Sequence, residues 1–201
     1  MLEIAQNWQP FRTWTTGTEW AERKKGMSDD PRFPAGKFVF SEPAARLRKE
    51  CIAQFREAPG LLRSAVNGLT KEQLSSRYRP EGWTLAQVVH HLAEADANAY
   101  PRLKYALTES APPSVMVAPQ ELWAELPDAR SVEIAGSLAM FEAIRLRWAD
   151  AWESLSEKDF LRQWRHTRFG LVTVDFLLQQ YAWHARHHTG HITTYRKSMG
   201  W

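Results

Sequence analysis

Four segments in which apolar residues recur at three- and four-residue intervals constrain the fold of this chain most. They contain Leu47, Cys51, Ile52 and Phe55; Leu85, Val88, Leu92, Ala95 and Ala99; Ile134, Leu138, Phe141, Ile144 and Trp148; and Phe176, Leu177, Tyr181, His184, His188 and Ile192. Such spacing gathers apolar side chains on one face of an α-helix. No strand pattern competes with it. The sequence therefore predicts an all-α fold, a four-helix bundle with long connections.

Capping residues and prolines predict where these helices begin and end. The expected starts are Ser41-Glu42-Pro43, Thr84, Ser131-Val132-Glu133 and Thr173. We expect Pro59 and Gly60 to interrupt the first helix and Pro101 to kink or end the second. Residues 109–130 contain four prolines and predict a long loop with one helical turn near Leu122-Trp123. Residues 163–172 predict a small extended excursion around Gly170.

The length of 201 residues predicts one domain with a real core. Residues 1–40 are rich in proline and glycine without a sustained apolar period, so we expect an irregular N-terminal arm there and the bundle domain over 41–201. Met27 is a candidate alternative start. In that case residues 1–26 are an extension.

Composition excludes several classes of protein. The 26 basic residues are interleaved with 23 acidic ones, so no clustered basic face predicts nucleic-acid binding. Cys51 is the single cysteine, which excludes an intrachain disulfide and a thiolate-built zinc site. No apolar stretch approaches the length of a membrane span or forms the core of a signal peptide. We therefore expect a cytoplasmic protein that does not bind membranes.

Six of the seven histidines lie in two short clusters. The first is His90-His91, and the second contains His184, His187, His188 and His191. Two histidines four residues apart on a helix stand on one face, about one turn from each other, which is a chelating distance. A third histidine from another helix completes a three-ligand site with one open position, the layout of a catalytic zinc centre.

Helical phase selects a ligand set from these clusters. His184 and His188 follow the apolar stripe of the last helix, whereas His187 and His191 fall on a more polar flank with Gln180 and Thr194. His91 lies beside the apolar seam of the second helix, and His90 shares a side with Gln87 and Glu94. We therefore predict His91, His184 and His188 as the metal ligands. His166, isolated in a loop, is expected to be an inert histidine.

Three motifs resemble the YfiT branch of the DinB-like superfamily over roughly Phe33 to Trp201. They are RPEGWTLAQVVHHLAEADANAYPRLKYALTE, ELWAELPD and YAWHARHHTGHI, and the upstream DPRFPAGKF also resembles the start of such proteins. The resemblance implies a four-helix bundle with one divalent metal ion per chain, Zn²⁺ or Ni²⁺, held by three histidines that correspond to His91, His184 and His188. It also implies a metal-dependent hydrolase and a homodimer. Relatives in the superfamily transfer low-molecular-weight thiols such as bacillithiol.

The chain departs from the family pattern at one position. Where members commonly have HHLADSHMN, this chain has HHLAEADAN, so Asp96 replaces a histidine. We expect the Asp96 carboxylate to face solvent, as lone helix carboxylates usually do, with a role as acceptor for an imidazole N–H as the alternative.

Three functions are compatible with such a site. A metal-bound water acting on a small-molecule substrate gives a hydrolase. A thiolate in the open position gives an S-transferase that conjugates a low-molecular-weight thiol to electrophiles. A fourth protein ligand gives a non-catalytic metal-binding protein.

The sequence leaves the accessory groups of these reactions open. Candidate bases are Glu94, Asp96, Asp175 and the remaining histidines, and the sequence singles out none of them. Arg102, Lys104, Arg186 and Arg196 are candidates for holding an anionic thiol, although helix charges usually form a solvated face.

Overall fold

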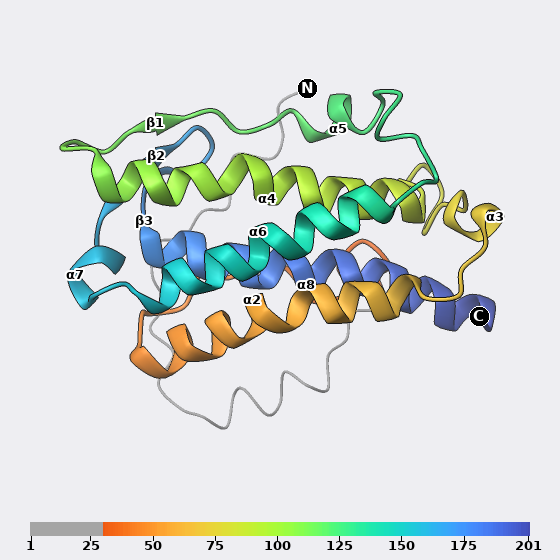
Figure 1. Cartoon of the computed structure of the whole chain (residues 1–201), viewed down its shortest axis with the longest axis horizontal. Coiled ribbons are helices and arrows are strands. Elements are labelled where there is room, and N and C mark those ends of the chain that lie inside the picture. Colours follow the sequence, from red (N-terminus) through yellow and green to blue (C-terminus); the bar gives the residue numbers. More distant parts are fainter. Residues whose placement is uncertain (1–29) are drawn as a thin grey trace.

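Four long helices lie side by side in the computed structural model, which describes residues 30–201 (Figure 1). They are α2 (Ala45–Val66), α4 (Leu85–Thr108), α6 (Ala135–Glu153) and α8 (Val174–Met199). The predicted all-α four-helix bundle is confirmed. Most of the predicted N-terminal arm, with Met27 and residues 1–26, lies outside the described residues, and residues 30–44 contain no helix or strand. No helix over 30–201 is long and apolar enough to cross a membrane.

The helices do not follow one another around the bundle. Both α2 and α4 pack mainly against α6 and α8, so α2 and α4 occupy opposite corners. In Figure 1, α4 and α6 run in the same direction, because residues 109–134 return along the length of the bundle before α6 begins. This returning segment lies along α4 and supplies part of the wall of the cavity described below.

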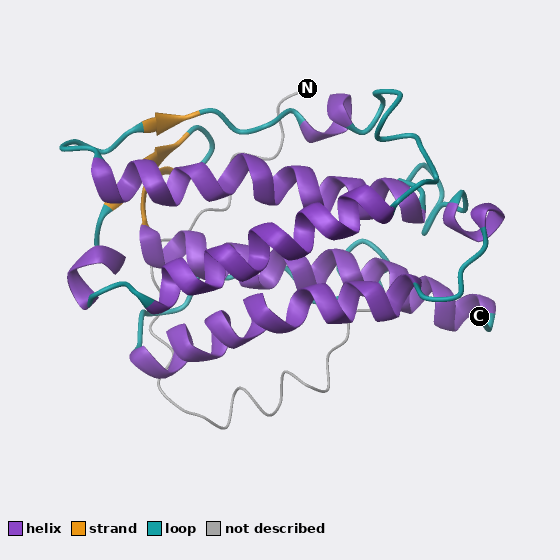
Figure 2. Ribbon diagram, in the orientation of Figure 1, coloured by secondary structure: helices purple, strands orange, loops and turns teal. Residues whose placement is uncertain are grey.

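Short elements fill the connections (Figure 2). They are α3 (Lys71–Leu74), α5 (Gln120–Trp123), α7 (Glu157–Phe160), β1 (Ser114–Val115), β2 (Gln163–His166) and β3 (Gly170–Thr173). Strand β2 pairs antiparallel with β3 and parallel with β1. The extended excursion around Gly170, whose φ is 72°, and the helical turn near Leu122 are therefore confirmed. The strand β1 in the proline-rich segment was not predicted from the sequence.

Local capping explains the starts of two long helices. The side chains of Thr84 and Thr173 accept hydrogen bonds from the backbone N–H groups three residues later, as predicted. The predicted start of α2 is wrong, because Ser41 is held extended by both polar atoms of the Gln179 side chain, at 2.9 and 3.0 Å. The predicted start of α6 is also early, since Ser131 precedes the helix and its carbonyl faces His90.

Neither internal proline ends its helix. Helix α2 continues through Pro59 to Val66, and α4 continues through Pro101 to Thr108, so the expected interruption of α2 is wrong. A proline inside a helix costs about 3 kcal/mol. Each proline has buried residues within three positions on both sides, among them Ala58, Leu62 and Leu103, and their packing offsets that cost.

Asp96 is not on a solvated face. Both its side chain and that of Arg145 on α6 are fully buried and form an ion pair, and Arg145 Nη2 also donates to the Tyr181 carbonyl at 3.1 Å. The Arg145 guanidinium lies 4.2 Å from the Phe55 ring and 5.0 Å from the Phe141 ring. Burial raises the pKa of Asp96 to about 6, and Arg145 opposes that rise. The expected solvent exposure is wrong because the carboxylate has a buried cationic partner.

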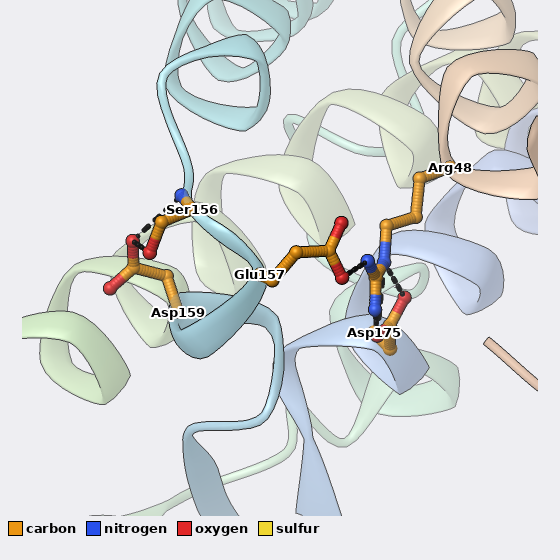
Figure 3. Close-up of polar contacts among 5 residues, drawn as sticks. All are labelled: Arg48, Ser156, Glu157, Asp159 and Asp175. Carbon is orange, nitrogen blue, oxygen red and sulfur yellow. Dashed lines mark hydrogen bonds and ion pairs between the residues drawn. The ribbon is translucent and has the colours of Figure 1, made fainter. Parts of the chain in front are cut away.

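A second buried arginine, Arg48 near the start of α2, links α2 to α7 and α8 (Figure 3). Arg48 donates to Asp175 at the start of α8, with Nη2 2.7 Å from Oδ2, and it also pairs with Glu157 of α7. Next to it, the Asp159 carboxylate accepts from the backbone and hydroxyl of Ser156, at 2.8 and 2.7 Å, and caps α7. Asp175, a candidate base from the sequence, is therefore committed to an ion pair in the fold.

Candidate metal centre

The three histidines chosen by helical phase converge between α4 and α8. The Nε2 atoms of His91 and His184 lie 3.1 Å apart. The ring of His188 lies 4.6 Å from that of His91 and 4.5 Å from that of His184, centroid to centroid. One nitrogen from each imidazole lies within 4.8 Å of the others. The structure thus brings together all three residues of the predicted ligand set.

The chemistry of this donor set suits a divalent ion such as Zn²⁺ or Ni²⁺. Tetrahedral bonds of about 2.0–2.1 Å to zinc place two ligand nitrogens roughly 3.3 Å apart, close to the observed His91–His184 separation. Burial lowers the pKa of His91 to about 3 and those of His184 and His188 well below their usual value, so all three rings are neutral at pH 7. The Nδ1 atoms of His184 and His188 are buried without a hydrogen-bond partner among residues 30–201.

The hydrogen bonds of His90 distinguish its role from that of the adjacent His91. Its Nδ1 lies 2.7 Å from the Ser137 hydroxyl, and its Nε2 lies 2.8 Å from the Ser131 carbonyl. Both ring nitrogens are therefore engaged with the start of α6 and its preceding loop. Since a metal ligand needs a free nitrogen lone pair, His90 serves the fold, whereas His91 is available to an ion.

A second group of histidines adjoins the first. His187, His188 and His191 also place one nitrogen each within 4.8 Å of the others. His187 and His191 lie on the more polar flank of α8 and are nevertheless buried, at 7% and 3% exposed. Trp183 stacks on His187 at 4.5 Å and Tyr78 stacks on His191 at 4.2 Å. These rings cover part of the flank.

A cavity of about 970 Å³ opens over the histidines. Its walls come from six parts of the chain: residues 32–38, residues 78–83, the inner face of α4, residues 117–123 of the returning segment, the β2–β3 turn and the inner face of α8. Trp83 lies against both ligand helices, with its ring 4.6 Å from that of His91 and stacked at 6.1 Å on His188. An aromatic wall next to a polar floor is the usual form of a small-molecule site.

Of the three carboxylates that the sequence offered as bases, Glu94 lines this cavity. Glu94 lies one turn after His91 on α4 and has no hydrogen-bond or ion-pair partner in the described part of the chain. Burial, followed by the charge of Asp128, raises its pKa. Asp96 and Asp175 are instead ion-paired with buried arginines and do not line the cavity.

The prediction that His166 is isolated in a loop is wrong. It ends β2, is 4% exposed, and lines the cavity. Its Nδ1 accepts from the backbone N–H groups of Arg168 at 2.9 Å and Phe169 at 3.3 Å, so the ring proton sits on Nε2. Burial lowers the pKa of His166 to about 4. The TRFG turn that follows it was the local signal for a hairpin that folds this imidazole inward.

Comparison with known protein families matches residues 54–192, most of the bundle, to the DinB superfamily. The chain belongs to the DinB superfamily. Its solved structural neighbours within the superfamily include YfiT from Bacillus subtilis, described as "a probable metal-dependent hydrolase with an unusual four-helix bundle topology". That structure superposes with a TM-score of 0.82 at 34% identity, over 86% of this chain and 99% of YfiT. The resemblance predicted from the sequence motifs is confirmed.

Curated relatives match this chain over nearly their whole length. A protein of Geobacillus thermodenitrificans is 43% identical over 180 residues, which cover 86% of this chain and 98% of the relative. One of Bacillus licheniformis is 41% identical over 177 residues, covering 86% of this chain and 99% of the relative. Both are named "putative metal-dependent hydrolase".

Proposed function

We propose that this DinB-superfamily protein is a metal-dependent hydrolase in which His91, His184 and His188 hold one divalent ion, Zn²⁺ or Ni²⁺. The observation that supports this most strongly is the convergence of three neutral imidazoles, one buried and two partly buried, at the floor of a cavity of about 970 Å³. The names of the relatives agree with it. No carboxylate joins these three histidines within ligand distance among residues 30–201, so the set has the three-ligand form of a catalytic centre.

The residues around the triad have distinct roles in this proposal. An ion with three neutral ligands and an open position supplies Lewis-acid chemistry and acidifies a coordinated water. Glu94 accepts a proton from the reacting water, because it lines the cavity one turn from His91 and burial raises its pKa. The Trp83 ring covers His91 and His188 and limits the access of bulk water.

The cavity volume is that of a site for a small molecule. We propose a small-molecule substrate for this reason. The homodimer, the cytoplasmic location and the boundary of the bundle domain at residue 41 stay predictions from the sequence.

Metal content and hydrolysis measured on the same samples test the proposal. Elemental analysis of tag-free protein is expected to find about one Zn²⁺ or Ni²⁺ per chain, and His91→Ala and His188→Ala are expected to lose it. Hydrolysis of an activated ester, p-nitrophenyl acetate, should disappear after chelation and return on adding the ion. His166→Gln is the matched control for metal content, since this histidine lines the cavity outside the triad. Full metal content in His91→Ala, or hydrolysis unaffected by chelation, would contradict the proposal.

A further inference from the structure

Arg102 is a buried cation without a carboxylate partner. Three arginines are buried in the part of the chain that the structure describes, namely Arg48, Arg102 and Arg145. Arg48 and Arg145 each pair with an aspartate. Arg102 is 3% exposed and has no acidic partner among residues 30–201. Buried charges are normally paired or bind a ligand, so an unpaired guanidinium in a cavity indicates that an anion comes from outside.

The contacts of Arg102 leave part of its guanidinium free. Nη2 donates to the Asn98 side-chain oxygen and more weakly to the Met116 carbonyl at 3.5 Å. Nε is buried and makes no hydrogen bond. The guanidinium carbon lies 5.5 Å from the Trp164 ring, which holds it in place from one side. These neighbours orient the group and do not neutralise its charge.

Arg102 shares the cavity with the histidine triad. His91, Ala95, Asn98 and Arg102 recur at three- and four-residue intervals on α4, and all four line the cavity. His91 and Arg102 are eleven positions apart, about 16 Å along the helix. Side chains on a helix lean toward its N-terminus, so Arg102 reaches back toward His91. The cavity therefore has histidines at one end and an arginine at the other.

Two further hydrogen-bond donors, on His166 and Tyr181, line the same cavity within reach of the Arg102 charge. The ring proton of His166 is on Nε2, because its Nδ1 accepts from two backbone N–H groups, and Nε2 has no partner among the described residues. The Tyr181 hydroxyl is a neighbour of Arg102, and its ring lies 5.4 Å from that of His184. A guanidinium with adjacent N–H and O–H donors is an arrangement that binds oxyanions.

From this geometry the structure assigns Arg102, His166 and Tyr181 to an anion-binding subsite that receives a carboxylate or phosphate group of the substrate, while the reacting group lies at the histidine triad. This assignment rests on the proposed function, since it takes the triad as the reaction centre. Substrates are thus elongated molecules with an anionic end. The other basic residues that the sequence suggested do not line this cavity: Lys104 is exposed, Arg186 lies in a groove between α2 and α8, and Arg196 donates to the Ala65 and Asn67 carbonyls.

Hydroxamates test the subsite separately from the metal. Acetohydroxamate and hydroxamates with a terminal carboxylate on chains of increasing length are titrated into the Zn²⁺-loaded protein by calorimetry. At the best length, the carboxylate is expected to raise affinity by about tenfold or more, the increment of one charge-assisted contact. Arg102→Gln should lose this increment while keeping its metal and its affinity for acetohydroxamate. The control Lys104→Gln, two residues further along α4, should retain it.

Two more arms complete the test. His166→Phe removes a neighbouring donor without altering α4 and should also reduce the increment, which keeps the assignment testable if Arg102→Gln folds poorly. Terminal phosphonates identify a phosphate group as the natural partner if they gain more affinity than carboxylates. The subsite is overturned if no chain length gains affinity, or if Arg102→Gln retains the gain.

Failure of the proposed metal function gives a different result. In that case acetohydroxamate does not bind to the protein at all. Inorganic phosphate and acetate are then titrated into the metal-free protein. Binding that is lost in Arg102→Gln and kept in Lys104→Gln supports the subsite without any metal, and equal binding by all three proteins overturns it.

Discussion

The Nε2 atoms of His91 and His184 lie 3.1 Å apart although 93 residues separate them in the sequence. Two neutral imidazoles in that position can share one proton, but the nearby ring of His188 then has no role in the contact. An ion bound between the three rings accounts for the positions of all three. This is the physical basis for the proposed metal centre.

The metal-free protein should lose stability as the pH falls from about 6.5 toward 4. The pKa of His91 is lowered to about 3 and those of His166, His187 and His191 to about 4, against 6.5 when unfolded. Over this range the unfolded chain binds protons that the folded chain does not, so the free energy of unfolding falls by about 1.4 kcal/mol per pH unit for each such histidine. Above pH 6.5 both states are neutral and this contribution is fully present. Urea denaturation across the pH range measures it.

The control for this titration is His166→Gln, which removes one such histidine outside the triad. In this variant the free energy of unfolding should fall less steeply with falling pH than in the parent, by the contribution of one proton, about 1.4 kcal/mol per pH unit. A free energy of unfolding that is independent of pH below 6.5 would show that the buried histidines are protonated in the folded state as readily as in the unfolded chain.

Asp96→Asn should destabilise the fold strongly. It leaves the fully buried Arg145 charge without its carboxylate, a change that costs about 3–5 kcal/mol in other buried ion pairs. The measurement is the urea midpoint of the metal-free protein. The matched control is Glu133→Gln, which breaks the exposed pair with Lys71 and should leave the midpoint almost unchanged. Equal effects of the two substitutions would mean that the buried pair contributes no more than a surface one.

Glu94→Gln should lower hydrolysis by about 10²–10⁴-fold while the metal content stays the same, because the amide cannot accept a proton. Glu121→Gln is the control, since it removes an exposed carboxylate from the wall of the same cavity. Rates are measured with p-nitrophenyl acetate at saturating metal. Unchanged hydrolysis in Glu94→Gln would exclude this residue as the base.

A cobalt-substituted sample separates hydrolysis from thiol transfer. The proposed hydrolase is expected to show an ionisation near neutral pH and no sulfur-to-cobalt charge-transfer band when 2-mercaptoethanol is added. A strong band at low thiol concentration would favour the S-transferase alternative, because it reports a thiolate in the open position.

The parts of the fold that local chemistry determines could be predicted from the sequence. Threonine caps identify the starts of α4 and α8, and helical phase then selects His91, His184 and His188 from six clustered histidines. Cap and phase depend on residues within a few positions of each other. The selected histidines meet because α4 and α8 pack against each other with these faces turned inward.

The burial of several polar residues could not be predicted, because their partners are distant in the sequence. Asp96 is buried because Arg145, 49 residues later, pairs with it. His191 is buried because Tyr78 stacks on it from the segment before α4. Ser41 does not start α2 because Gln179 binds its backbone from α8, 138 residues later. Each of these contacts depends on how the helices pack in the tertiary structure. The sequence pattern predicts the fold class and not these individual contacts.

The most direct test of the metal centre is an anomalous-difference map from crystals of the purified protein, measured at the absorption edge of the metal that elemental analysis identifies. We expect one peak per chain, about 2.0–2.2 Å from a nitrogen of each of His91, His184 and His188. A peak among His187, His188 and His191, the neighbouring group of histidines, would contradict the ligand assignment. The absence of any peak would contradict the metal centre itself.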